Sequence, residues 1–494
     1  MNLNDLYLLS PELAVASVAI LIVLVDLVVK RKEILPVLAI LGLSIPCVMS
    51  ISLWGDVDSG GQQAGMFGTL VVDKFSIFLK FILLASVASV ILSSTEYVRK
   101  FTRFQGEYYA LILFSTSGMM LLTSTTELIT IYVALELTAL PLAALAAFLR
   151  DGRSIEAGLK FLLLSAVSSA ILLYGIVMVY GITGTTSLLE IADRIPQLDL
   201  NPDIAFGSHA LLFGLILIIA GFGFKIASVP FQMWAPDVYE GAPTPVTMFL
   251  SVASKAAGFA VIIRIFSSAF LIDVLSVDWA IVFAVLSALS MTIGNLVAIR
   301  QSNIKRLMGY STVAHAGYIL MGMASLGYGS EGSGILLGPS GMLFYLAGFA
   351  VTNITAFAVV IAVSQRLDSY NISAYSGVAR RAPFLAAALA LAMVSLTGLP
   401  PAVGFWAKIY LFGAAVDAGL TWLVVIGVLN SVISAYYYLR IVKAMYLAPA
   451  ESEETIITAL PIRAALLFSF LGTLIFGIYP APLLALARTA ASAL

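Results

Sequence analysis

Four lysines and one glutamate lie inside long apolar stretches of the chain, where a charged group is expensive. Lys225 stands in GFGFKIASVPFQMWAP and Glu136 in YVALELTALP. The other three lysines of this kind are Lys80, Lys255 and Lys408. An unpaired ammonium group at the centre of a bilayer costs at least about 2.5 kcal/mol. A lysine that loses its water can release a proton near neutral pH, whereas a nearby carboxylate holds that proton in place. These residues therefore predict a buried proton relay.

Each of these residues also has a purely structural interpretation. Lys80 lies about eight residues into its apolar stretch, so its side chain could reach the membrane interface. Glu136 could serve only as the ion-pair partner of one lysine, although three central lysines facing one acid fit a single pair poorly. His315, in YSTVAHAGYILMG, is either a neutral buried histidine bonded to a serine or threonine, or a relay group that titrates near neutral pH.

The sequence predicts no metal site and no bound cofactor in this chain. The two histidines, His209 and His315, are far apart, and neither stands at ligand spacing from another histidine or cysteine. Cys47 is the single cysteine, which excludes a cysteine-held iron–sulfur centre. A phosphate-binding GxxxxGK[ST] motif is absent, and no GxGxxG motif follows a predicted strand, as a dinucleotide-binding site requires. A net charge of −1 gives no indication of a nucleic-acid partner.

The composition places these residues in a lipid bilayer. Of the 494 residues, 61% are hydrophobic and 11% charged, whereas soluble domains carry about 25% charged residues. Apolar stretches of about 20 residues, each long enough to cross the hydrocarbon core as a helix, recur along the whole chain. We therefore expect an all-α polytopic membrane protein with about fourteen transmembrane helices. The predicted spans are 10–29, 34–54, 72–93, 108–123, 126–149, 156–180, 208–235, 243–267, 278–299, 306–327, 336–364, 383–414, 420–447 and 460–482.

The basic residues of the loops test this number of spans and orient the chain. Eighteen of the 26 fall on one side: Lys30, Arg31, Lys32, Arg99, Lys100, Arg103, Arg150, Arg153, Lys160, Arg300, Lys305, Arg306, Arg366, Arg380, Arg381, Arg440, Lys443 and Arg463. The other side holds four: Lys74, Arg194, Arg264 and Arg488. The positive-inside rule makes the first side cytoplasmic. Both termini are then expected on the outer side, and the polar segment Gly184–Gly207 is expected to be an outer surface loop.

Proline and glycine interrupt two of the predicted spans beside a buried lysine. Pro230 and Pro236 follow Lys225, and Gly398, Pro400, Pro401 and Gly404 precede Lys408. In lipid, such breaks persist only against protein or a wet cavity. The two spans lie five apart, so two tandem units of five helices enter the membrane from opposite sides and form an inverted repeat, as in many transporters. Unrelated proline kinks are the alternative. We expect one membrane domain, 1–494, with three helices in 1–107, repeats in 108–267 and 278–447, and a last helix in 460–494.

Three long motifs resemble the antiporter-like membrane subunits of respiratory NADH-quinone oxidoreductase (complex I), with subunit N the nearest. They are PFQMWAPDVYEGAPTPVTMFLSVASKAAGFAVIIRIF, SNIKRLMGYSTVAHAGYILMG and GLPPAVGFWAKIYLF. The resemblance covers nearly the whole chain. It implies fourteen helices with two inverted five-helix repeats, broken helices 7 and 12, and no redox cofactor in the chain itself. It also implies a bacterial cytoplasmic membrane and partners among the other membrane subunits of the complex.

The resemblance also implies the activity and the residues that perform it. Protons would cross the membrane while quinone is reduced with NADH elsewhere in the complex. The functional residues carry over as Glu136, Lys225, Lys255 and Lys408, to which we add His315 from the residue pattern. Lys408 favours subunit N, because its siblings typically place a glutamate there. One position departs from the family: Gln232 follows PF where a histidine is usual, and an amide cannot titrate.

The expected relay begins with Glu136 paired to Lys225. Charge displacement in a neighbouring subunit would weaken this pair, and the proton would then move through Lys255 and His315 to Lys408 and out. Three alternatives stay open at the level of sequence. The chain could belong to a multi-subunit cation/proton antiporter, to a ferredoxin-driven photosynthetic-type relative, or to a membrane scaffold whose buried charges only fix helix packing.

Overall fold

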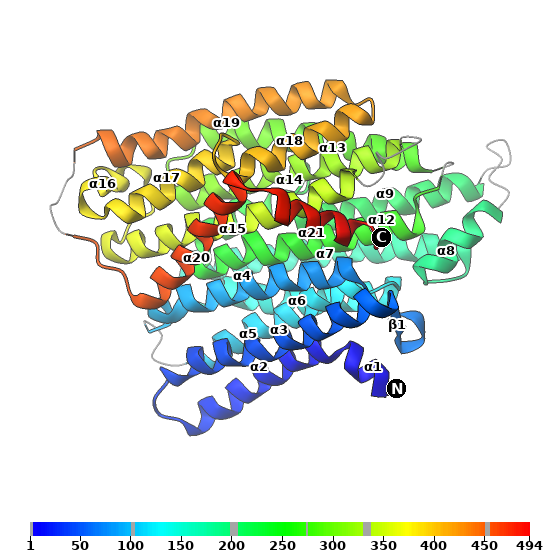
Figure 1. The fold of residues 1–494 in the computed structure, drawn as a ribbon, viewed down its shortest axis with the longest axis horizontal. Helices are drawn as coiled ribbons and strands as arrows, with labels where there is room; N and C mark the ends of the chain where they lie inside the picture. The colour runs from blue at the N-terminus through cyan, green and yellow to red at the C-terminus, as the bar shows by residue number, and fades with distance from the viewer. Residues whose placement is uncertain (1–2, 100–103, 198–205, 273–274, 330–336, 450–454) are drawn as a thin grey trace.

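Every predicted span corresponds to a helix or to a pair of helices in the structure, a computed structural model that describes residues 3–99, 104–197, 206–272, 275–329, 337–449 and 455–494. The helices run side by side in one bundle (Figure 1). The fourteen spans correspond to α2 (Ser10–Val28), α3 (Ile34–Gly60), α4 (Lys74–Val98), α5 (Gln105–Ser124), α6 (Leu128–Ala146), α7 (Gly152–Thr183), α9 with α10 (Phe206–Ile226, Trp234–Gly241), α11 with α12 (Thr244–Phe249, Lys255–Ala269), α13 (Ser276–Ile299), α14 (Ile304–Tyr328), α15 (Leu337–Leu367), α17 with α18 (Pro383–Thr397, Val403–Asp417), α19 (Thr421–Leu447) and α20 (Leu460–Ile478).

The described residues contain eleven helical spans that are long and apolar enough to cross a membrane. The remaining three spans are α5, α14 and the broken pair α17 and α18. An all-α polytopic membrane fold is therefore confirmed. One β-hairpin departs from it: β1 (Gln63–Gly65) pairs antiparallel with β2 (Leu70–Val72) between α3 and α4. The predicted outer loop contains a short helix, α8 (Leu188–Arg194), and its residues 198–205 lie outside the described residues.

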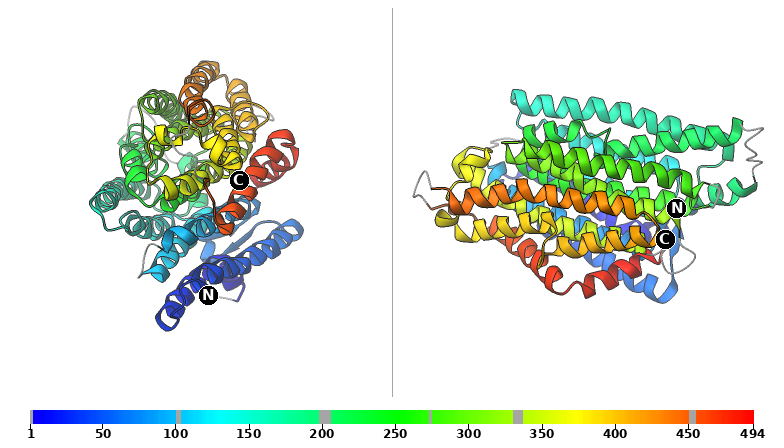
Figure 2. Two further views of the ribbon diagram at one scale, coloured as in Figure 1. Left: turned by 90° about the vertical axis from the view of Figure 1, so that its left-hand side faces the viewer. Right: turned by 90° about the horizontal axis from the view of Figure 1, so that it is seen from above.

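Burial separates a central helix from peripheral ones. The span formed by α11 and α12 is buried along its whole length, whereas α2, α3, α7, α19 and α20 keep much of their surface exposed. Seen along the bundle, α2 and α3 lie at one edge, beyond α4 (Figure 2). Outward-facing apolar side chains in these peripheral helices have the composition that lipid requires. The ionisable groups of interest are carried by the inner helices, by the face that α2 turns inward and, for Glu136, by α6.

Two spans are interrupted as the sequence predicts, each beside a buried lysine. The first break lies between α9 and α10, directly after Lys225. The second lies between α17 and α18, and Lys408 follows it on α18. The span between Thr244 and Ala269 has an unexpected irregularity: Leu250–Ser254 form one π-helical turn, and Lys255 follows it immediately. Turns of this kind are frequent at functional sites.

The same backbone pairing occurs at two places that lie about 180 residues apart in the chain. Before α6 and after α7, Leu128 N donates to Thr186 O (2.9 Å) and Leu188 N to Thr126 O (3.0 Å). Before α14 and after α15, Ile304 N donates to Tyr370 O (2.8 Å) and Ile372 N to Ser302 O (2.9 Å).

The two pairings lie at opposite ends of the bundle. The first leads into α8, and the second leads towards α16 (Val378–Arg381); these two short helices lie at opposite ends in Figure 1. An inverted repeat has this property, because its second unit presents the equivalent segment to the opposite side.

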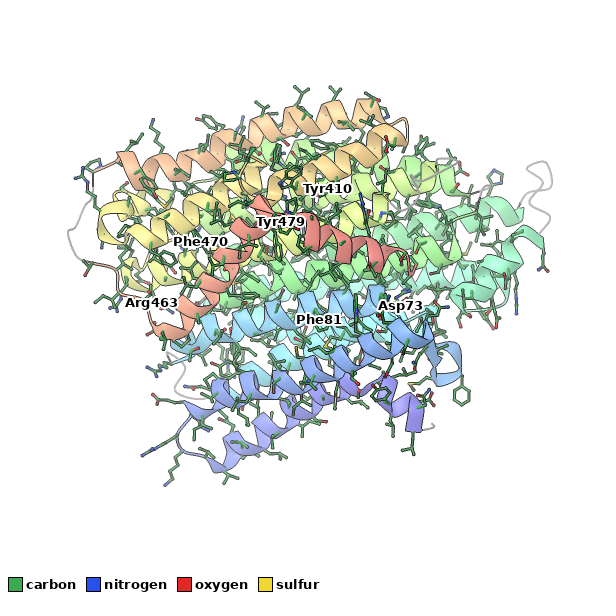
Figure 3. The ribbon with its side chains drawn as sticks, viewed as in Figure 1. Asp73, Phe81, Tyr410, Arg463, Phe470 and Tyr479 are labelled. Atoms are coloured by element: carbon green, nitrogen blue, oxygen red, sulfur yellow. The ribbon has the colours of Figure 1, made fainter. Side chains whose placement is uncertain are left out.

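Three basic residues differ from their expected surroundings. Lys80 does not reach the interface; it is fully buried and pairs with Glu12 of α2 at 2.7 Å. Arg264, expected in an outer loop, is buried on α12 and pairs with Asp73 at 2.5 Å. Asp73 lies at one end of the bundle and Arg463 at the other (Figure 3). Lys305, counted as a cytoplasmic loop residue, is also buried, where it donates to the carbonyl oxygens of Glu240 and Ala242.

Candidate proton-transfer site

Lys225 lies at the end of α9, where the helix stops and a buried turn begins. The ammonium nitrogen of Lys225 is buried and has no hydrogen-bond partner among the described residues. Its side chain lies against α12, since a Cβ added at Gly258 would be 3.3 Å from the Cγ of Lys225. Gly258 is one helical turn from Lys255. The close approach of α12 therefore places the side chain of Lys225 one helical turn along α12 from Lys255.

Glu136 and Lys225 are joined by a serine and a small cavity rather than by a direct pair. The described residues show no ion pair between the two side chains; Ser169 Oγ donates to Glu136 Oε1 instead. A cavity of about 20 Å³ lies between Ser169 and Lys225 and is also lined by Ser165 and Ser168. This volume suffices for one water molecule, and the serine hydroxyls supply polar partners for it. The direct pair that we expected is wrong for this conformation.

Lys255 donates a hydrogen bond to a main-chain oxygen inside the bundle. Its Nζ bonds the carbonyl oxygen of Thr312 on α14 at 2.5 Å and lies 5.6 Å from the ring centre of Phe349. Phe349 is also within 5.0 Å, centre to centre, of the His315 ring. His315 follows Thr312 by almost one helical turn. The side chain of Lys255 therefore reaches the helix that carries His315, and both side chains lie beside Phe349.

His315 forms hydrogen bonds with tyrosine hydroxyls, not with the serine or threonine that its structural interpretation predicts. Nδ1 lies 2.6 Å from the hydroxyl of Tyr345, and Nε2 lies 3.1 Å from that of Tyr438. Tyr438 bonds in turn to Ser311. An imidazole with a hydroxyl on each nitrogen can accept a proton on one side and release it on the other. The geometry therefore suits a relay group.

Lys408 closes the series at the second broken helix. Its Nζ donates to Thr397 O (2.8 Å) and to Ser431 Oγ (3.0 Å). Thr397 is the last residue of α17. Because the helix breaks there, the carbonyl group of Thr397 is free to accept the hydrogen bond from Lys408. The same Nζ lies 4.4 Å from the ring centre of Tyr318, whose hydroxyl also bonds Ser431 at 3.1 Å. The Tyr318 and His315 rings are 5.8 Å apart, centre to centre.

A polar cavity of about 330 Å³ opens at the end of the bundle that carries the basic loops. It is lined by acidic and basic side chains in alternation: Arg153, Glu156, Lys160, Asp237, Glu240 and Arg306. Arg306 bridges Asp237 (2.8 Å) and Glu240 (3.0 Å), and Lys160 also pairs with Asp237 at 2.8 Å. Asp237 and Glu240, which the sequence left as either a plain loop or the mouth of a path, belong to α10. This places the cavity beside α10, at the end of the first broken helix that lies among the basic loops.

The structure brings together most of the predicted residues and adds others. Lys225, Lys255, His315 and Lys408 form one buried series, with Glu136 beside it, whereas Lys80 belongs to a separate pair in α2 and α4. Sequence reasoning missed the hydroxyl groups between them: those of Ser169, Tyr318, Tyr345, Ser431 and Tyr438. One signal was present, since Ser165, Ser168 and Ser169 share one face of an apolar helix. Gln232, the departure from the family, leaves its amide oxygen buried without a partner in the described part of the chain.

No cluster of three or more potential metal ligands occurs among the residues that the structure describes. The polar atoms gathered around the buried lysines are hydroxyl and main-chain carbonyl groups, which suit proton transfer between an ammonium group, an imidazole and ordered water. The arrangement is therefore a set of hydrogen-bond donors and acceptors inside an apolar bundle.

Comparison with known proteins identifies the family of this arrangement. Residues 125–434 match the family described as "NADH:quinone oxidoreductase/Mrp antiporter, TM". The chain is 44% identical to NADH-quinone oxidoreductase subunit N of Dehalococcoides mccartyi over 98% of its own length and 99% of the relative.

Two solved structures share the fold. A chain of respiratory complex I from Thermus thermophilus superposes with a TM-score of 0.80 at 32% identity, covering 97% of this chain and 99% of that one. A chain of the Mrp complex from a Dietzia species gives a TM-score of 0.83 at 22% identity, covering 100% and 97%, and shows the fold alone. The chain belongs to the NADH:quinone oxidoreductase/Mrp antiporter transmembrane family and, within it, to the group of NADH-quinone oxidoreductase N subunits.

Proposed function

We propose that this chain moves protons across the membrane as the N-type, antiporter-like subunit of an NADH-quinone oxidoreductase. The observation that carries the proposal is the series of buried ionisable groups, Lys225, Lys255, His315 and Lys408, with hydroxyl groups around its second half, in an otherwise apolar bundle. A structural scaffold needs paired charges, whereas three of these lysines have no carboxylate within ion-pair distance among the described residues. Proton exchange accounts for buried lysines that have no carboxylate partner.

The proposed route starts at the polar cavity beside Asp237 and Arg306. A proton enters from there to Lys225, passes along α12 to Lys255, and reaches Lys408 through His315 and the hydroxyl groups of Tyr438, Tyr318 and Ser431. Each transfer moves a proton from a donor nitrogen or oxygen to a neighbouring lone pair. No covalent bond between heavy atoms forms or breaks. Small rotations of side chains and ordered water would complete the steps between groups.

Glu136 acts in this proposal as the control on Lys225. Its carboxylate lies one hydroxyl group and one small cavity away from the lysine. At an effective dielectric constant of about 20, a unit charge at about 8 Å still contributes roughly 2 kcal/mol. Glu136 is also half-exposed on a helix whose outer face is apolar. A charge shift in a neighbouring membrane subunit would therefore change the proton affinity of Lys225 through Glu136.

The proposal includes the chain's place in the cell and in its complex. The bias of basic residues towards one side supports an orientation with both termini outside. The bacterial relatives support a bacterial cytoplasmic membrane. Quinone and NADH act elsewhere in the complex, and this chain holds no cofactor. Its partners are the neighbouring membrane subunits. The matched backbone pairings at the two ends of the bundle support the repeats 108–267 and 278–447 as the working units, flanked by the helices of 1–107 and 460–494.

The test is a measurement of proton uptake in membrane vesicles that contain the complete complex, with quinone reduction as the driving reaction. We expect acidification that depends on electron transfer and proceeds at the same rate with and without sodium ions. The antiporter alternative, supported by the shared family description and by the fold of the Mrp chain, requires sodium or another cation to move in exchange. Sodium-dependent transport without a quinone reductase would contradict the proposal.

A further inference from the structure

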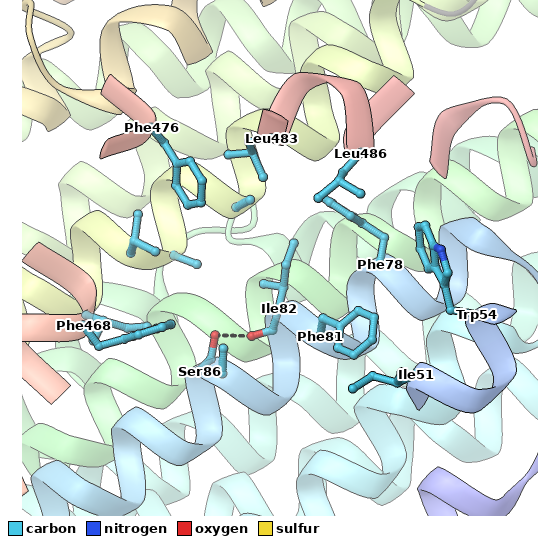
Figure 4. Close-up of a pocket in the computed structure, with 15 residues that line it drawn as sticks. Ile51, Trp54, Phe78, Phe81, Ile82, Ser86, Phe468, Phe476, Leu483 and Leu486 are labelled. Atoms are coloured by element: carbon cyan, nitrogen blue, oxygen red, sulfur yellow. Dashed lines mark hydrogen bonds between the residues drawn. The ribbon is translucent and has the colours of Figure 1, made fainter. Parts of the chain in front are cut away.

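A long groove, separate from the relay, runs down the peripheral face between α3, α4 and α20. Two adjoining apolar cavities form it. The first, of about 480 Å³, is drawn in Figure 4 and includes Ile51, Trp54 and Phe476. The second, of about 590 Å³, adjoins it at Phe81, Ala85 and Phe468. Both have almost wholly apolar walls, and both lie where the proposed bilayer would be.

The groove follows one stripe of each helix. On α4 the lining residues include a stripe spaced by three or four: Phe78, Phe81, Ala85, Ala88, Leu92, Thr95 and Arg99. On α3 they are Pro36, Ile40, Leu43, Cys47, Ile51 and Trp54. Small side chains, among them Ala85, Ala88 and Ala464, line the bottom of the groove and leave space there. The two apolar cavities share lining residues, and the same stripes of α3 and α4 continue beyond them at Pro36 and Thr95.

A basic pocket closes the cytoplasmic end of this stripe. This cavity of about 520 Å³ is lined by Lys30, Arg31, Lys32 and Arg99, together with Thr95 and Tyr109. Two of its cations are already paired, Lys32 with Asp26 (2.7 Å) and Arg99 with Glu33 (3.0 Å). Lys30 and Arg31 have no ion-pair partner among the described residues. The pocket therefore offers two free positive charges at the level of the lipid headgroups.

We infer that this groove binds one anionic, two-chain phospholipid of the cytoplasmic leaflet. Its phosphate would lie at Lys30 and Arg31, and its acyl chains would follow α4 from Leu92 to Phe81. The eleven helical steps between these two residues span about 16 Å, which equals about half of a 30 Å hydrocarbon core. Basic pockets between membrane helices on the cytoplasmic side suit anionic headgroups. The inference rests on the proposed orientation of the chain and is independent of the proton relay.

The charge complementarity selects this occupant over an apolar helix of a neighbouring subunit. Such a helix would fill the apolar part but would leave the two free cations without a partner at the mouth. A phospholipid satisfies both parts with one molecule. The cavity in Figure 4 continues the groove into the outer half of the membrane and would be filled by a second, unselected lipid chain.

The test is native mass spectrometry of the full chain in detergent, titrated with phosphatidylglycerol and with phosphatidylcholine of the same acyl chains. The wild-type chain should retain one phosphatidylglycerol and release phosphatidylcholine. Replacing both free cations, Lys30→Gln with Arg31→Gln, should weaken the adduct by about 25-fold, because each basic residue contributes roughly fivefold. The double variant Arg380→Gln with Lys443→Gln removes two exposed charges from the same side outside the groove and should bind like the wild type.

A second variant tests the apolar part without changing charge. Ala88→Phe fills the groove beside Leu92 and should also abolish retention, whereas Val432→Phe adds similar bulk at a position on α19 that is 68% exposed and should not. Equal retention of the two lipids, or retention unchanged by the charge and groove variants, would overturn the inference. A wild-type chain that holds no lipid at all would also overturn it and would point to a neighbouring subunit as the occupant.

Discussion

At the scale of single residues, Gly398 fixes where the Lys408 ammonium group lies. Gly398 has a φ of +90°, and a Cβ added there would lie 2.7 Å from the Cδ of Lys408. The lysine side chain therefore lies directly across the break, where it reaches the free carbonyl group of Thr397. A glycine at this position permits both the turn and the close passage of the lysine.

Gly398→Ala should consequently displace Lys408 and reduce proton pumping by about tenfold, since the left-handed backbone alone costs about 1–2 kcal/mol for other residues. Pumping would be measured in vesicles that contain the assembled complex. Gly413→Ala on α18 is the control, because nothing lies within 4 Å of a Cβ added there. Equal pumping by the two variants would show that the position of Lys408 is unimportant.

Ser169 is the residue through which Glu136 meets the cavity beside Lys225. Ser169→Ala should lower coupled proton transfer severalfold, because the carboxylate loses its hydroxyl donor and the cavity loses a polar wall. Ser169→Thr keeps the hydroxyl and should restore most of the rate. Initial rates of vesicle acidification and of quinone reduction, recorded together, make the comparison. Full activity of the alanine variant would separate Glu136 from the relay.

The sequence predicted the lysines but not their partners, and the reason is physical. A charge inside an apolar stretch is visible from composition alone, because it violates the requirement of the bilayer. The tyrosine and serine hydroxyl groups around His315 and Lys408 are compatible with lipid, so nothing in the sequence marks them. The same limit explains Glu136, whose distance from Lys225 depends on how α6 and α9 pack against α7 and not on spacing along the chain.

At the scale of helices, the buried pair of Lys80 and Glu12 holds α4 against α2. Lys80→Met should destabilise the protein by about 3–5 kcal/mol, because it leaves the Glu12 carboxylate buried without its partner. Adding Glu12→Gln removes the unpaired charge and should recover most of the loss. Thermal unfolding in detergent gives the stabilities. Proton pumping by the assembled double variant should equal that of the wild type, and a loss of pumping there would place the pair on the proton path.

The start of α6 carries a carboxylate whose pKa links stability to pH. Glu127 accepts hydrogen bonds from Thr130 N and Oγ1, both at 2.6 Å. Partial burial raises the pKa of Glu127, but its hydrogen bonds outweigh burial, and the net pKa is lower than usual. A lowered pKa means that the stabilisation is present above the unfolded pKa and is lost as the pH falls through the folded one.

Glu127→Ala should therefore lower the stability at neutral pH by about 1 kcal/mol, the usual value of an N-cap. The difference from the wild type should shrink as the pH falls below 4. Asn303, which caps α14 by bonding Lys305 N (2.9 Å), occupies the matching place in the second half. Asn303→Ala should lose similar stability at every pH, since an amide does not titrate. Melting temperatures measured between pH 3 and pH 7 check both variants, and a loss for Glu127→Ala that stays constant with pH would contradict the assignment.

At the scale of the whole molecule, the number of helices and the two breaks followed directly from the sequence. Apolar length, prolines and glycines act locally, so Pro230 and Gly398 marked the interruptions between α9 and α10 and between α17 and α18. The paired segments at Leu128 and Ile304 could not be foreseen, because they join residues about sixty positions apart. The burial of Arg264 and Lys305 was missed for the same reason. A charged residue near a helix end is predicted to lie in a loop, and only the folded structure shows the partners that allow its burial.

The central claim is that Lys225 receives the proton that the complex pumps. The direct measurement is quinone-linked acidification of vesicles that carry Lys225→Ala, with electron transfer to quinone recorded in parallel and assembly checked on a native gel. Lys225→Arg keeps the charge and cannot release the proton, so it separates the two roles. We predict that both variants assemble and that pumping and coupled electron transfer fall together. Normal pumping by an assembled Lys225→Ala complex would contradict the relay.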